Sequence, residues 1–358
     1  MPDFPGYYPA PVGSVTTNFQ SEAPLTKAAA AALNMALTQA WSDPAKLPAN
    51  SRAARILLDE AKNTYASHLG LRVEYINFIG EVGYGYFLGI QGLLTPERTL
   101  IHSRIDRQEV HAIGRDHNSK VLPVSKLGEI EKPTPASNQV LAWQLRNGET
   151  GISQPELIDD QSLIFVDATA SGARAPLPKN WAVALYDARA WDGPQGLGII
   201  AIKDEANWNN PIPRIDNRKV PDNTSLPLII AGAIALEQWV EGERAMKAQM
   251  TSLATEIRKF ISEQIGEVNV LPGPHDLISV SFNGVDAEYL VTELDRLGFA
   301  VDSGSACKPT ALAPSHVLEA MSQPTNGNLR IYLHHDTTPK QVQEFLTALK
   351  TVVEKFRN

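Results

Sequence analysis

Short apolar runs alternate with longer amphipathic stretches over most of the chain, and this pattern predicts the order of its strands and helices. The runs in the first two thirds read YINFIG, TLIHSRI, KVLPV, QVLAWQL, SLIFVDA, WAVALYDA and GLGIIAIK. Several of them are separated by stretches with helical spacing. Short apolar strands separated by helical segments are typical of βαβ units and a largely parallel sheet. The sequence therefore predicts an α/β fold.

Longer helices stand out where apolar residues recur at helical spacing. We expect them at residues 25–41, at 51–69 and at 226–265, the last ending near Gly266. Beyond that glycine, short apolar runs and shorter helical stretches predict a smaller α+β unit. The first twenty residues are rich in Pro and Gly and predict an extended arm.

The length and charge of the chain bound its organisation and its partners. Its 358 residues are 43% apolar, so the chain can bury a large core and form two domains. We place a large domain at residues 21–249 and a small domain at residues 1–20 plus 250–358. The net charge of -8 argues against nucleic-acid binding, which needs a basic surface.

Three features of the sequence bear on where the protein is located: its N-terminus, its apolar runs and its cysteine count. The N-terminal sequence MPDFPGYYPAPVG lacks a basic segment followed by an apolar one, so we expect no signal peptide. No apolar run reaches the roughly 20 residues that span a bilayer. A single cysteine, Cys307, cannot form an intrachain disulfide, so no oxidising compartment is implied. We expect a cytoplasmic protein that does not bind membranes.

The last third of the chain carries the most specific motifs. It contains LISVSFNGVDAEYLVTELDRLGFAVDSGSAC, then APSHVLEAM, then LRIYLHHDTT. Upstream lie SLIFVDATASGARAPL and NGETGISQPELI. In order and spacing these segments resemble the cysteine desulfurases, the class V branch of the pyridoxal-phosphate (PLP) aminotransferase superfamily. The resemblance implies PLP-transferase fold type I, with a mainly parallel, seven-stranded large domain and a smaller α+β domain.

The resemblance also implies partners. The family builds its cofactor sites between the large domain and a partner subunit, so we expect a homodimer. A sulfur-acceptor protein or a functional desulfurase is implied as a further partner, and neither a nucleic acid nor a membrane is expected.

Four residues match positions to which the resemblance gives a role. Asp167 matches the carboxylate that pairs with the PLP pyridinium, although an acid at a strand end also caps the next turn. Thr224 matches a threonine that reaches the neighbouring subunit's phosphate. Arg330 matches the arginine that grips the substrate carboxylate, and its alternative is a surface ion pair. Cys307 matches the persulfide-accepting cysteine and lies beside Lys308, whereas a lone cysteine is otherwise a small buried hydrophobe.

Other positions depart from the family's pattern. The segment GPQGLG fixes the register, and Ala190 then stands where the Schiff-base lysine belongs, preceded by Arg189 in place of a histidine. Arg107 replaces the ring-stacking histidine and adds a positive charge. Ala170 and Gly148 replace a glutamine and an asparagine.

The phosphate loop departs as well. The segment Phe78–Gly89 lacks the family's Ser and Thr residues, and Glu81 would repel a phosphate there. Alanine has no nucleophilic atom, so no Schiff base can form at Ala190. We therefore expect no cofactor, and we interpret Asp167, Thr224, Arg107 and Ala190 as a vestigial cofactor site. Trp191 is a candidate to fill the space of the cofactor ring.

The histidines are scattered. His334 and His335 replace a Gly-Arg pair of the family, and we favour solvated side chains over a place in the vacated pocket. No spacing suggests a zinc site or another metal site. The remaining histidines considered are His102, His111 and His117.

These observations leave three functions open. The leading hypothesis is a cysteine-desulfurase-like protein that has lost PLP-dependent catalysis and acts by protein contact, either as a scaffold or through a persulfide on Cys307. The second is an active desulfurase or class V transferase that binds PLP non-covalently. The third is a protein that binds a small carboxylate in the vacated pocket with Arg330, Arg107 and the histidines. Whether the protein is an enzyme stays open, with a pseudoenzyme favoured.

Overall fold

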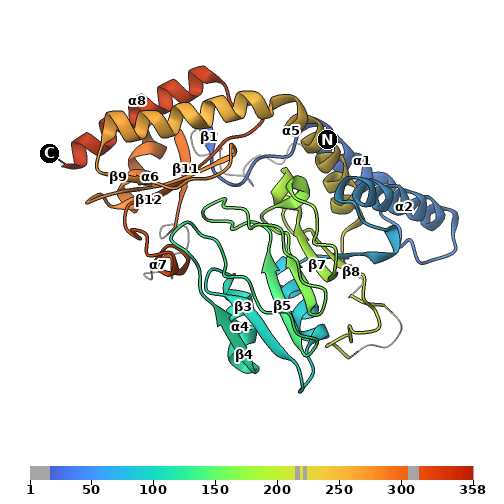
Figure 1. Ribbon diagram of the computed structural model, residues 1–358. Coiled ribbons are helices and arrows are strands. Elements are labelled where there is room, and N and C mark those ends of the chain that lie inside the picture. Colours follow the sequence, from blue (N-terminus) through green and yellow to red (C-terminus); the bar gives the residue numbers. More distant parts are fainter. Residues whose placement is uncertain (1–16, 214–217, 221–223, 305–313, 358) are drawn as a thin grey trace.

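The computed structural model describes residues 17–213, 218–220, 224–304 and 314–357, which form two domains joined by one long helix (Figure 1). The larger domain is built on a seven-stranded sheet with the order β2-β8-β7-β6-β5-β3-β4. Its strands are parallel except β8, which is antiparallel to both of its neighbours. The strands are β2 (Ile76–Ile79), β3 (Thr99–Ser103), β4 (Ser119–Leu122), β5 (Gln139–Gln144), β6 (Leu163–Asp167), β7 (Trp181–Asp187) and β8 (Gly198–Ile202). The predicted mainly parallel α/β fold is confirmed.

One face of the large sheet is covered by long helices. These are α1 (Lys27–Gln39), α2 (Ala49–Leu69) and the first half of α5 (Leu226–Phe260). They enclose a core that includes Trp143 and Tyr186 from the sheet. The pattern-based expectation of helices near 25–41 and 51–69 is confirmed to within two residues at each end.

The other face is covered by shorter helices that approach the sheet closely. They are α3 (Val82–Tyr86), the π-helical turn Phe87–Gln91 and α4 (Gln108–Asp116). A Cβ added at Gly89 would lie 2.3 Å from the ring of Phe165, so only glycine allows this approach. Because both faces are covered, the central strands are almost wholly apolar, as expected of a buried parallel sheet.

The smaller domain has a five-stranded sheet with the order β1-β11-β12-β10-β9. Its strands are antiparallel except that β1, from the N-terminal arm, is parallel to β11. The strands are β1 (Thr17–Phe19), β9 (Val268–Val270), β10 (Leu277–Phe282), β11 (Phe299–Ser303) and β12 (Asn328–Tyr332). The helices that complete it are α6 (Ala287–Arg296), α7 (His316–Ala320) and α8 (Pro339–Arg357). The predicted smaller α+β unit is confirmed.

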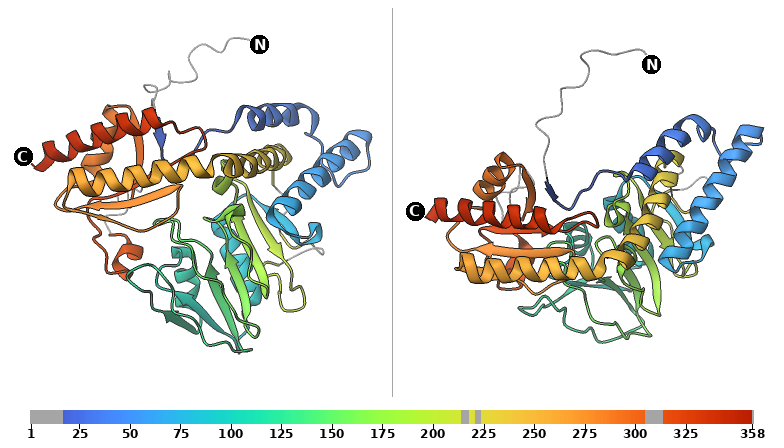
Figure 2. Two further views of the ribbon diagram at one scale, coloured as in Figure 1. Left: turned by 45° about the horizontal axis from the view of Figure 1, so that its top comes forward. Right: turned by 90° about the horizontal axis from the view of Figure 1, so that it is seen from above.

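The long helix α5 belongs to both domains. Its first half contributes Leu236 to the large-domain core, and its second half contributes Ile257 to the small-domain core, where α8 lies beside it (Figure 2). A π-helical turn follows and ends at Gly266, whose φ of +66° favours glycine. The expected division between residues 249 and 250 falls inside this helix and stays a prediction.

The N-terminal arm is described only from residue 17, where it pairs with the small-domain sheet. From β1 the chain runs along the gap between the domains before α1 begins (Figure 1). Over the described ranges, none of the helices has the length and apolar character needed to cross a bilayer.

Candidate functional site

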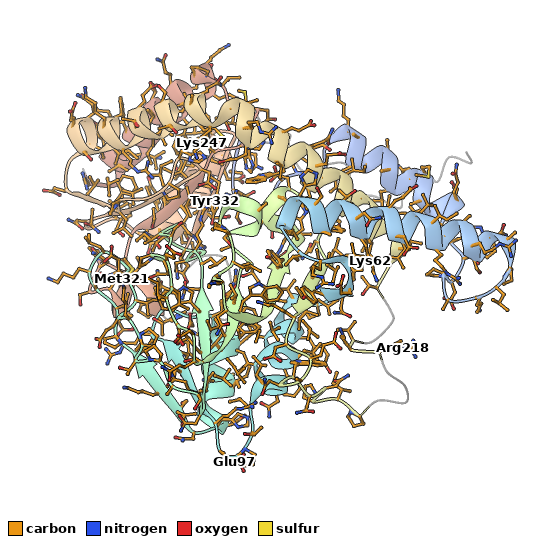
Figure 3. The ribbon with its side chains drawn as sticks, turned by 45° about the vertical axis from the view of Figure 1, so that its right-hand side comes forward. Lys62, Glu97, Arg218, Lys247, Met321 and Tyr332 are labelled. Atoms are coloured by element: carbon orange, nitrogen blue, oxygen red, sulfur yellow. The ribbon has the colours of Figure 1, made fainter. Side chains whose placement is uncertain are left out.

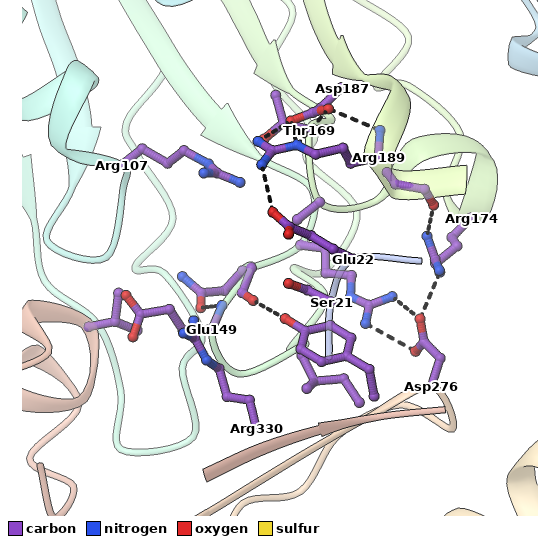
Figure 4. Close-up of a pocket in the computed structure, with 18 of the residues that line it drawn as sticks. Ser21, Glu22, Arg107, Glu149, Thr169, Arg174, Asp187, Arg189, Asp276 and Arg330 are labelled. Atoms are coloured by element: carbon purple, nitrogen blue, oxygen red, sulfur yellow. Dashed lines mark hydrogen bonds and ion pairs between the residues drawn. The ribbon is translucent and has the colours of Figure 1, made fainter. Parts of the chain in front are cut away.

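A pocket of about 730 Å³ lies between the two domains, where the carboxyl ends of the large-domain strands face the small-domain sheet. Open parallel sheets bind ligands at such strand ends. We refer to it as the interdomain pocket. Its lining includes arginines from both domains (Figure 4), namely Arg107, Arg146, Arg174, Arg189 and Arg330.

Asp167 ends β6 and lies just behind the pocket wall. Its Oδ1 accepts hydrogen bonds from the Thr169 amide at 2.9 Å and the Thr169 hydroxyl at 2.6 Å. Its Oδ2 accepts a hydrogen bond from the Tyr86 hydroxyl at 2.7 Å. Burial, together with the charge of Asp167, raises the pKa of Tyr86 well above its ordinary value, so this tyrosine stays a donor. The carboxylate is thus already well satisfied by the protein.

Arg107, at the start of α4, extends into the pocket in front of this carboxylate (Figure 4). Its Nε is 4.0 Å from Asp167 Oδ2. A Cβ added at Gly148 would lie 3.4 Å from Arg107 Nη2 and 3.6 Å from the Cβ of Ala170. Three positions at which the sequence departs from the family's pattern therefore lie together on one part of the pocket wall.

Ala190 lines the pocket from the short turn Ala188–Trp191. Its carbonyl accepts a hydrogen bond from Arg174 Nη1 at 2.8 Å. Trp191 does not fill the space of a cofactor ring, because its side chain is fully buried in the large-domain core and donates to the Gly232 carbonyl at 3.2 Å. That expectation was wrong: the tryptophan packs behind the wall rather than in the pocket.

Arg189 is held by acids from two directions. Its Nε and Nη2 bind the Asp187 carboxylate, the latter at 2.7 Å from Oδ2, and this contact raises the pKa of Arg189. Its Nη1 lies 3.7 Å from Glu22 Oε1, from the N-terminal arm. Sequence reasoning named Arg189 but not its two acidic partners.

A buried cluster of charges joins the domains at one side of the pocket. Asp276, from the small domain, accepts two hydrogen bonds from Arg146 at 2.9 Å and 3.0 Å and contacts Arg174 Nε at 2.9 Å. Burial alone would raise the pKa of the Asp276 carboxyl, but the two guanidinium groups hold it well below its ordinary value. Sequence reasoning missed this cluster, because its members are far apart in the chain and no motif marks them.

The two adjacent histidines of the last third line the pocket, contrary to the favoured expectation that they are solvated. His334 Nε2 is 2.9 Å from the Gln20 carbonyl. His335 lies 3.5 Å from Glu243, which also binds His275 at 2.8 Å. Although burial opposes it, these histidine contacts lower the pKa of Glu243 to about 2.

A further acid, Asp106, lines the pocket next to Arg107. Burial raises its pKa to about 7, against the hydrogen bonds it accepts from the Ser103 amide and the Gln144 side chain. It therefore exchanges a proton near neutral pH. No sequence signal singled it out, because it lies in a turn between two described elements.

Arg330, on β12, is on the small-domain wall of the same pocket. Its Nη2 donates to the Ser303 carbonyl at 2.6 Å. Its neighbour Tyr332 lies between the domains (Figure 3) and donates to the Gly148 carbonyl at 3.0 Å. The structure thus brings Ala190, Arg107 and Arg330 to one pocket, as the predicted register requires, and their roles stay predictions.

Two predicted residues cannot be assigned to this pocket. Thr224 donates to the Phe78 carbonyl at 3.1 Å and is not among the described residues that line it. Its contact with a neighbouring subunit's phosphate stays a prediction. Cys307 lies outside the described residues, and so does its neighbour Lys308.

The residues that the resemblance assigns to PLP binding, some retained and some altered, show whether PLP can be attached here covalently as it is in the family. Asp167 keeps its place, but its oxygens already accept hydrogen bonds and Arg107 lies before it. At the start of α3, Glu81 Oε1 accepts from the Gly83 amide at 2.9 Å, so a carboxylate holds the amide that a phosphate would need. Ala190 supplies no amine. These residues do not fit PLP attached covalently.

Over the part of the chain that the structure describes, no group of histidine, cysteine and acidic side chains is arranged to hold a metal ion.

Comparison with known proteins finds similarity to class V aminotransferases and to cysteine desulfurases. Residues 226–345 match the family model described as aminotransferase class-V. The cysteine desulfurase IscS of Dictyoglomus turgidum is 23% identical, over 96% of this chain and 95% of the relative. A cysteine desulfurase of Sinorhizobium fredii is 26% identical, over 70% of this chain and 68% of the relative.

Solved structures agree in fold. A NifS-like protein superimposes with a TM-score of 0.82 at 19% identity, covering 95% of this chain and 99% of that protein. A NifS-like protein from Rickettsia africae superimposes with a TM-score of 0.80 at 17% identity, covering 94% and 99%. At these identities the likeness establishes the fold alone.

The comparisons contradict one expectation from the sequence. We expected no cofactor, whereas the relatives are cysteine desulfurases, a PLP-dependent class. The expectation went wrong because it took the loss of the lysine, together with the departures at Arg107 and in the phosphate loop, to exclude all binding of PLP. What the pocket excludes is attachment through residue 190. By its motifs and its relatives the chain is similar to the cysteine desulfurases and to the class V aminotransferase family, and it shares its fold with NifS-like proteins.

Proposed function

We propose that this cysteine-desulfurase-like protein does not perform the lysine-dependent catalysis of its relatives and instead binds a small carboxylate in the interdomain pocket. The observation that carries the proposal is the position of Ala190 in a pocket wall shared with arginines of both domains. A methyl group offers no nucleophile, whereas guanidinium groups suit carboxylates in geometry and charge.

The arginines of the pocket differ in how far the protein itself neutralises them. Arg146 and Arg174 both bind Asp276, and Arg189 binds Asp187. Arg107 makes no side-chain hydrogen bond within the described ranges, and its Nε is 4.0 Å from the carboxylate it approaches. It is therefore the guanidinium of the large-domain wall best able to accept a ligand's negative charge.

Arg330 supplies the opposite wall. It lies across the pocket on β12, and the resemblance assigns its position to the substrate carboxylate. The pocket volume of about 730 Å³ is in the range of small-molecule sites. Arg107 and Arg330 would orient the ligand by its charged ends, and Tyr332 helps to hold the domains together beside it.

A second candidate is catalysis with PLP held without a covalent bond. The observation that favours it is Asp167, which keeps its position at the end of β6 beside the pocket. PLP supplies an electron sink when it is bound in such enzymes.

A persulfide on Cys307 is a further proposal that rests on residues outside the described ranges. The homodimer, the sulfur-acceptor or desulfurase partner and the cytoplasmic location likewise stay proposals.

Calorimetry with the full chain tests carboxylate binding. Cysteine, alanine and succinate would be titrated into the natural protein and into the variants Arg330→Gln and Arg107→Gln. We expect binding that either variant weakens at least tenfold, which corresponds to about 1.4 kcal/mol. Arg72→Gln, an exposed arginine paired with Glu74, is the matched control and should bind as the natural protein does. Binding that neither pocket variant weakens would refute the carboxylate site.

Sulfide release from cysteine, with PLP added, separates the two candidates. We expect no turnover by the natural chain above that of free PLP. An absorbance titration with PLP on the same sample reports whether the cofactor binds. Turnover by the natural chain that Asp167→Asn abolishes would overturn the first half of the proposal and establish the second candidate. The variant Ala190→Lys then reports whether the amine alone was missing.

A further inference from the structure

A second cleft, with a volume of about 530 Å³, is lined by residues of β3, β4, α4 and α7 and of the turn between β3 and α4. We refer to it as the outer cleft. Its lining residues that carry polar or charged side chains are His102, Arg104, Gln108, His111, Arg115, Ser119, His316 and Glu319. It shares only Gln108 and His316 with the interdomain pocket among the residues described.

Three histidines that line this cleft, His102, His111 and His316, form a row. The rings of His102 and His111 are 5.0 Å apart, and those of His111 and His316 are 5.5 Å apart, both edge to face. A Cβ at Gly114 would lie 2.6 Å from His102 Nε2, so α4 presses directly on the first ring. His316 is fixed by the Asp106 carbonyl, 2.9 Å from its Nε2.

Two buried ring nitrogens in this row have no partner in the described part of the chain. They are Nδ1 of His102, a residue that is 2% exposed, and Nε2 of His111. A buried polar atom left without a partner costs about 1–3 kcal/mol. Native proteins rarely leave such atoms unsatisfied, so this row of rings is a place where the described chain leaves hydrogen-bonding capacity unused.

The charges around the row are positive. Arg104 and Arg115 line the cleft, and within the described ranges neither forms an ion pair. Glu319 is the only acid of the described lining. This is a local excess of positive charge on a chain whose net charge is -8. A metal cation would be repelled by the two guanidinium groups, and no metal-ligand group is found among the described residues.

We propose that the outer cleft binds a small tetrahedral oxyanion, either free phosphate or the phosphate group of a small ester. Arg104 and Arg115 supply the charge, and the imidazole rings of His102 and His111, which line the cleft, supply hydrogen bonds. A tetrahedral oxyanion offers three or four oxygens and can meet two guanidinium groups and two rings together, whereas a carboxylate offers two. The site is independent of the carboxylate proposed for the interdomain pocket.

Nuclear magnetic resonance of the histidine ring nitrogens, on the full chain at constant ionic strength and pH, tests this. Inorganic phosphate should shift the ring signals of His102 and His111 in a saturable way, and equal additions of chloride should not. Arg104→Gln and Arg115→Gln should each weaken phosphate binding about tenfold. Arg296→Gln, an arginine whose side chain is 71% exposed and which pairs with Glu293, is the control and should leave it unchanged.

Further titrations distinguish free phosphate from a phosphate ester as the ligand, and binding in the outer cleft from binding in the interdomain pocket. Tighter binding of glycerol phosphate than of phosphate identifies an ester as the ligand, and equal or weaker binding identifies the free anion. Arg107→Gln, in the interdomain pocket, should leave phosphate binding unchanged, and Arg104→Gln should leave carboxylate binding unchanged. Signals that do not move with phosphate at millimolar concentration, or that move equally in Arg104→Gln, would overturn the proposal.

Discussion

The two walls of the interdomain pocket differ in how closely they follow the cysteine desulfurases. The small-domain wall keeps Arg330 and lies within residues 226–345, which match the class V model. The large-domain wall departs from the family's pattern at Arg107, Gly148 and Ala190. Two of these departures are neighbours in space as well, since a Cβ at Gly148 would lie 3.4 Å from the Arg107 guanidinium.

This difference agrees with the proposed change of ligand better than with general decay of the fold. Decay would also reach buried positions, yet β8 is wholly buried and apolar, and β7 is so except for half-buried Trp181 and the terminal Asp187. The altered positions are moreover contiguous, because a Cβ at Gly148 would be in van der Waals contact with Arg107 Nη2 and with the Cβ of Ala170. The following variants weaken the connection between the walls or alter one wall alone.

The largest effect is expected from Asp276→Asn, which removes the connection between the walls. The substitution leaves Arg146 and Arg174 buried without their anion. Breaking a buried ion pair by removing one partner costs about 3–5 kcal/mol, so the free energy of unfolding should fall by that amount. Denaturant unfolding measures it. Glu293→Gln, which removes surface ion pairs with Lys355 and Arg296, is the control and should lower the free energy of unfolding far less.

A smaller effect is expected when the free energy of unfolding is followed as the pH falls into the acid range. The pKa of Glu243 is lowered to about 2 from an ordinary value of 4.5 by His275 and His335. A carboxyl whose pKa is lower in the folded state stabilises the fold above its unfolded pKa and loses that stabilisation as the pH falls. Stability should therefore decline between pH 4.5 and about 2, and Glu243→Gln should flatten this decline.

The matched control for this decline is Glu74→Gln, whose carboxylate is 52% exposed. It should leave the slope of the natural protein unchanged. Equal slopes in Glu243→Gln and the natural protein between pH 4.5 and about 2 would contradict the assignment of this decline to Glu243.

Much of the fold and part of the site could be predicted from the sequence, because the signals are local. The apolar run SLIFVDA marked both β6 and the acid at its end, and helical spacing marked α5 from its first residue. The register of GPQGLG placed Ala190, and the structure confirms that Ala190, Arg107 and Arg330 line one pocket.

The remaining features depend on contacts between segments that are distant in the chain. Asp276 meets Arg146 across 130 positions only because the small domain docks on the large one. The histidines of the outer cleft come from β3, α4 and α7, so no spacing rule could group them. For the same reason sequence reasoning dismissed His102 and His111 as scattered.

A change confined to the large-domain wall should cost less. Tyr86→Phe removes the 2.7 Å hydrogen bond to Asp167, while Thr169 still donates to the other oxygen. We expect a loss of about 1–2 kcal/mol in the free energy of unfolding. Tyr84→Phe is the control in the same helix, since that side chain is 41% exposed. If both variants are equally stable, the contact between Tyr86 and Asp167 contributes nothing.

The smallest effect is expected from Glu22→Gln, which acts on the large-domain wall from the N-terminal arm. The arm is held in place because β1 pairs with β11 and the Ser21 amide donates to Asp302 Oδ2 at 2.8 Å. Glu22 thereby brings a carboxylate, 69% exposed, to 3.7 Å from Arg189. An exposed ion pair of this kind is worth about 0.2–1 kcal/mol.

In the pocket, this acid competes with a ligand carboxylate for the same positive wall. Glu22→Gln should therefore raise carboxylate affinity by up to about fivefold, which corresponds to about 1 kcal/mol, as measured by the calorimetric titration. Glu74→Gln, remote from the pocket, should leave the affinity unchanged. A fall in affinity would mean that Glu22 attracts the ligand, so that the ligand presents a positive group such as an amine to the large-domain wall. The carboxylate would then be bound by the small-domain wall alone, and Arg330 would carry the whole effect.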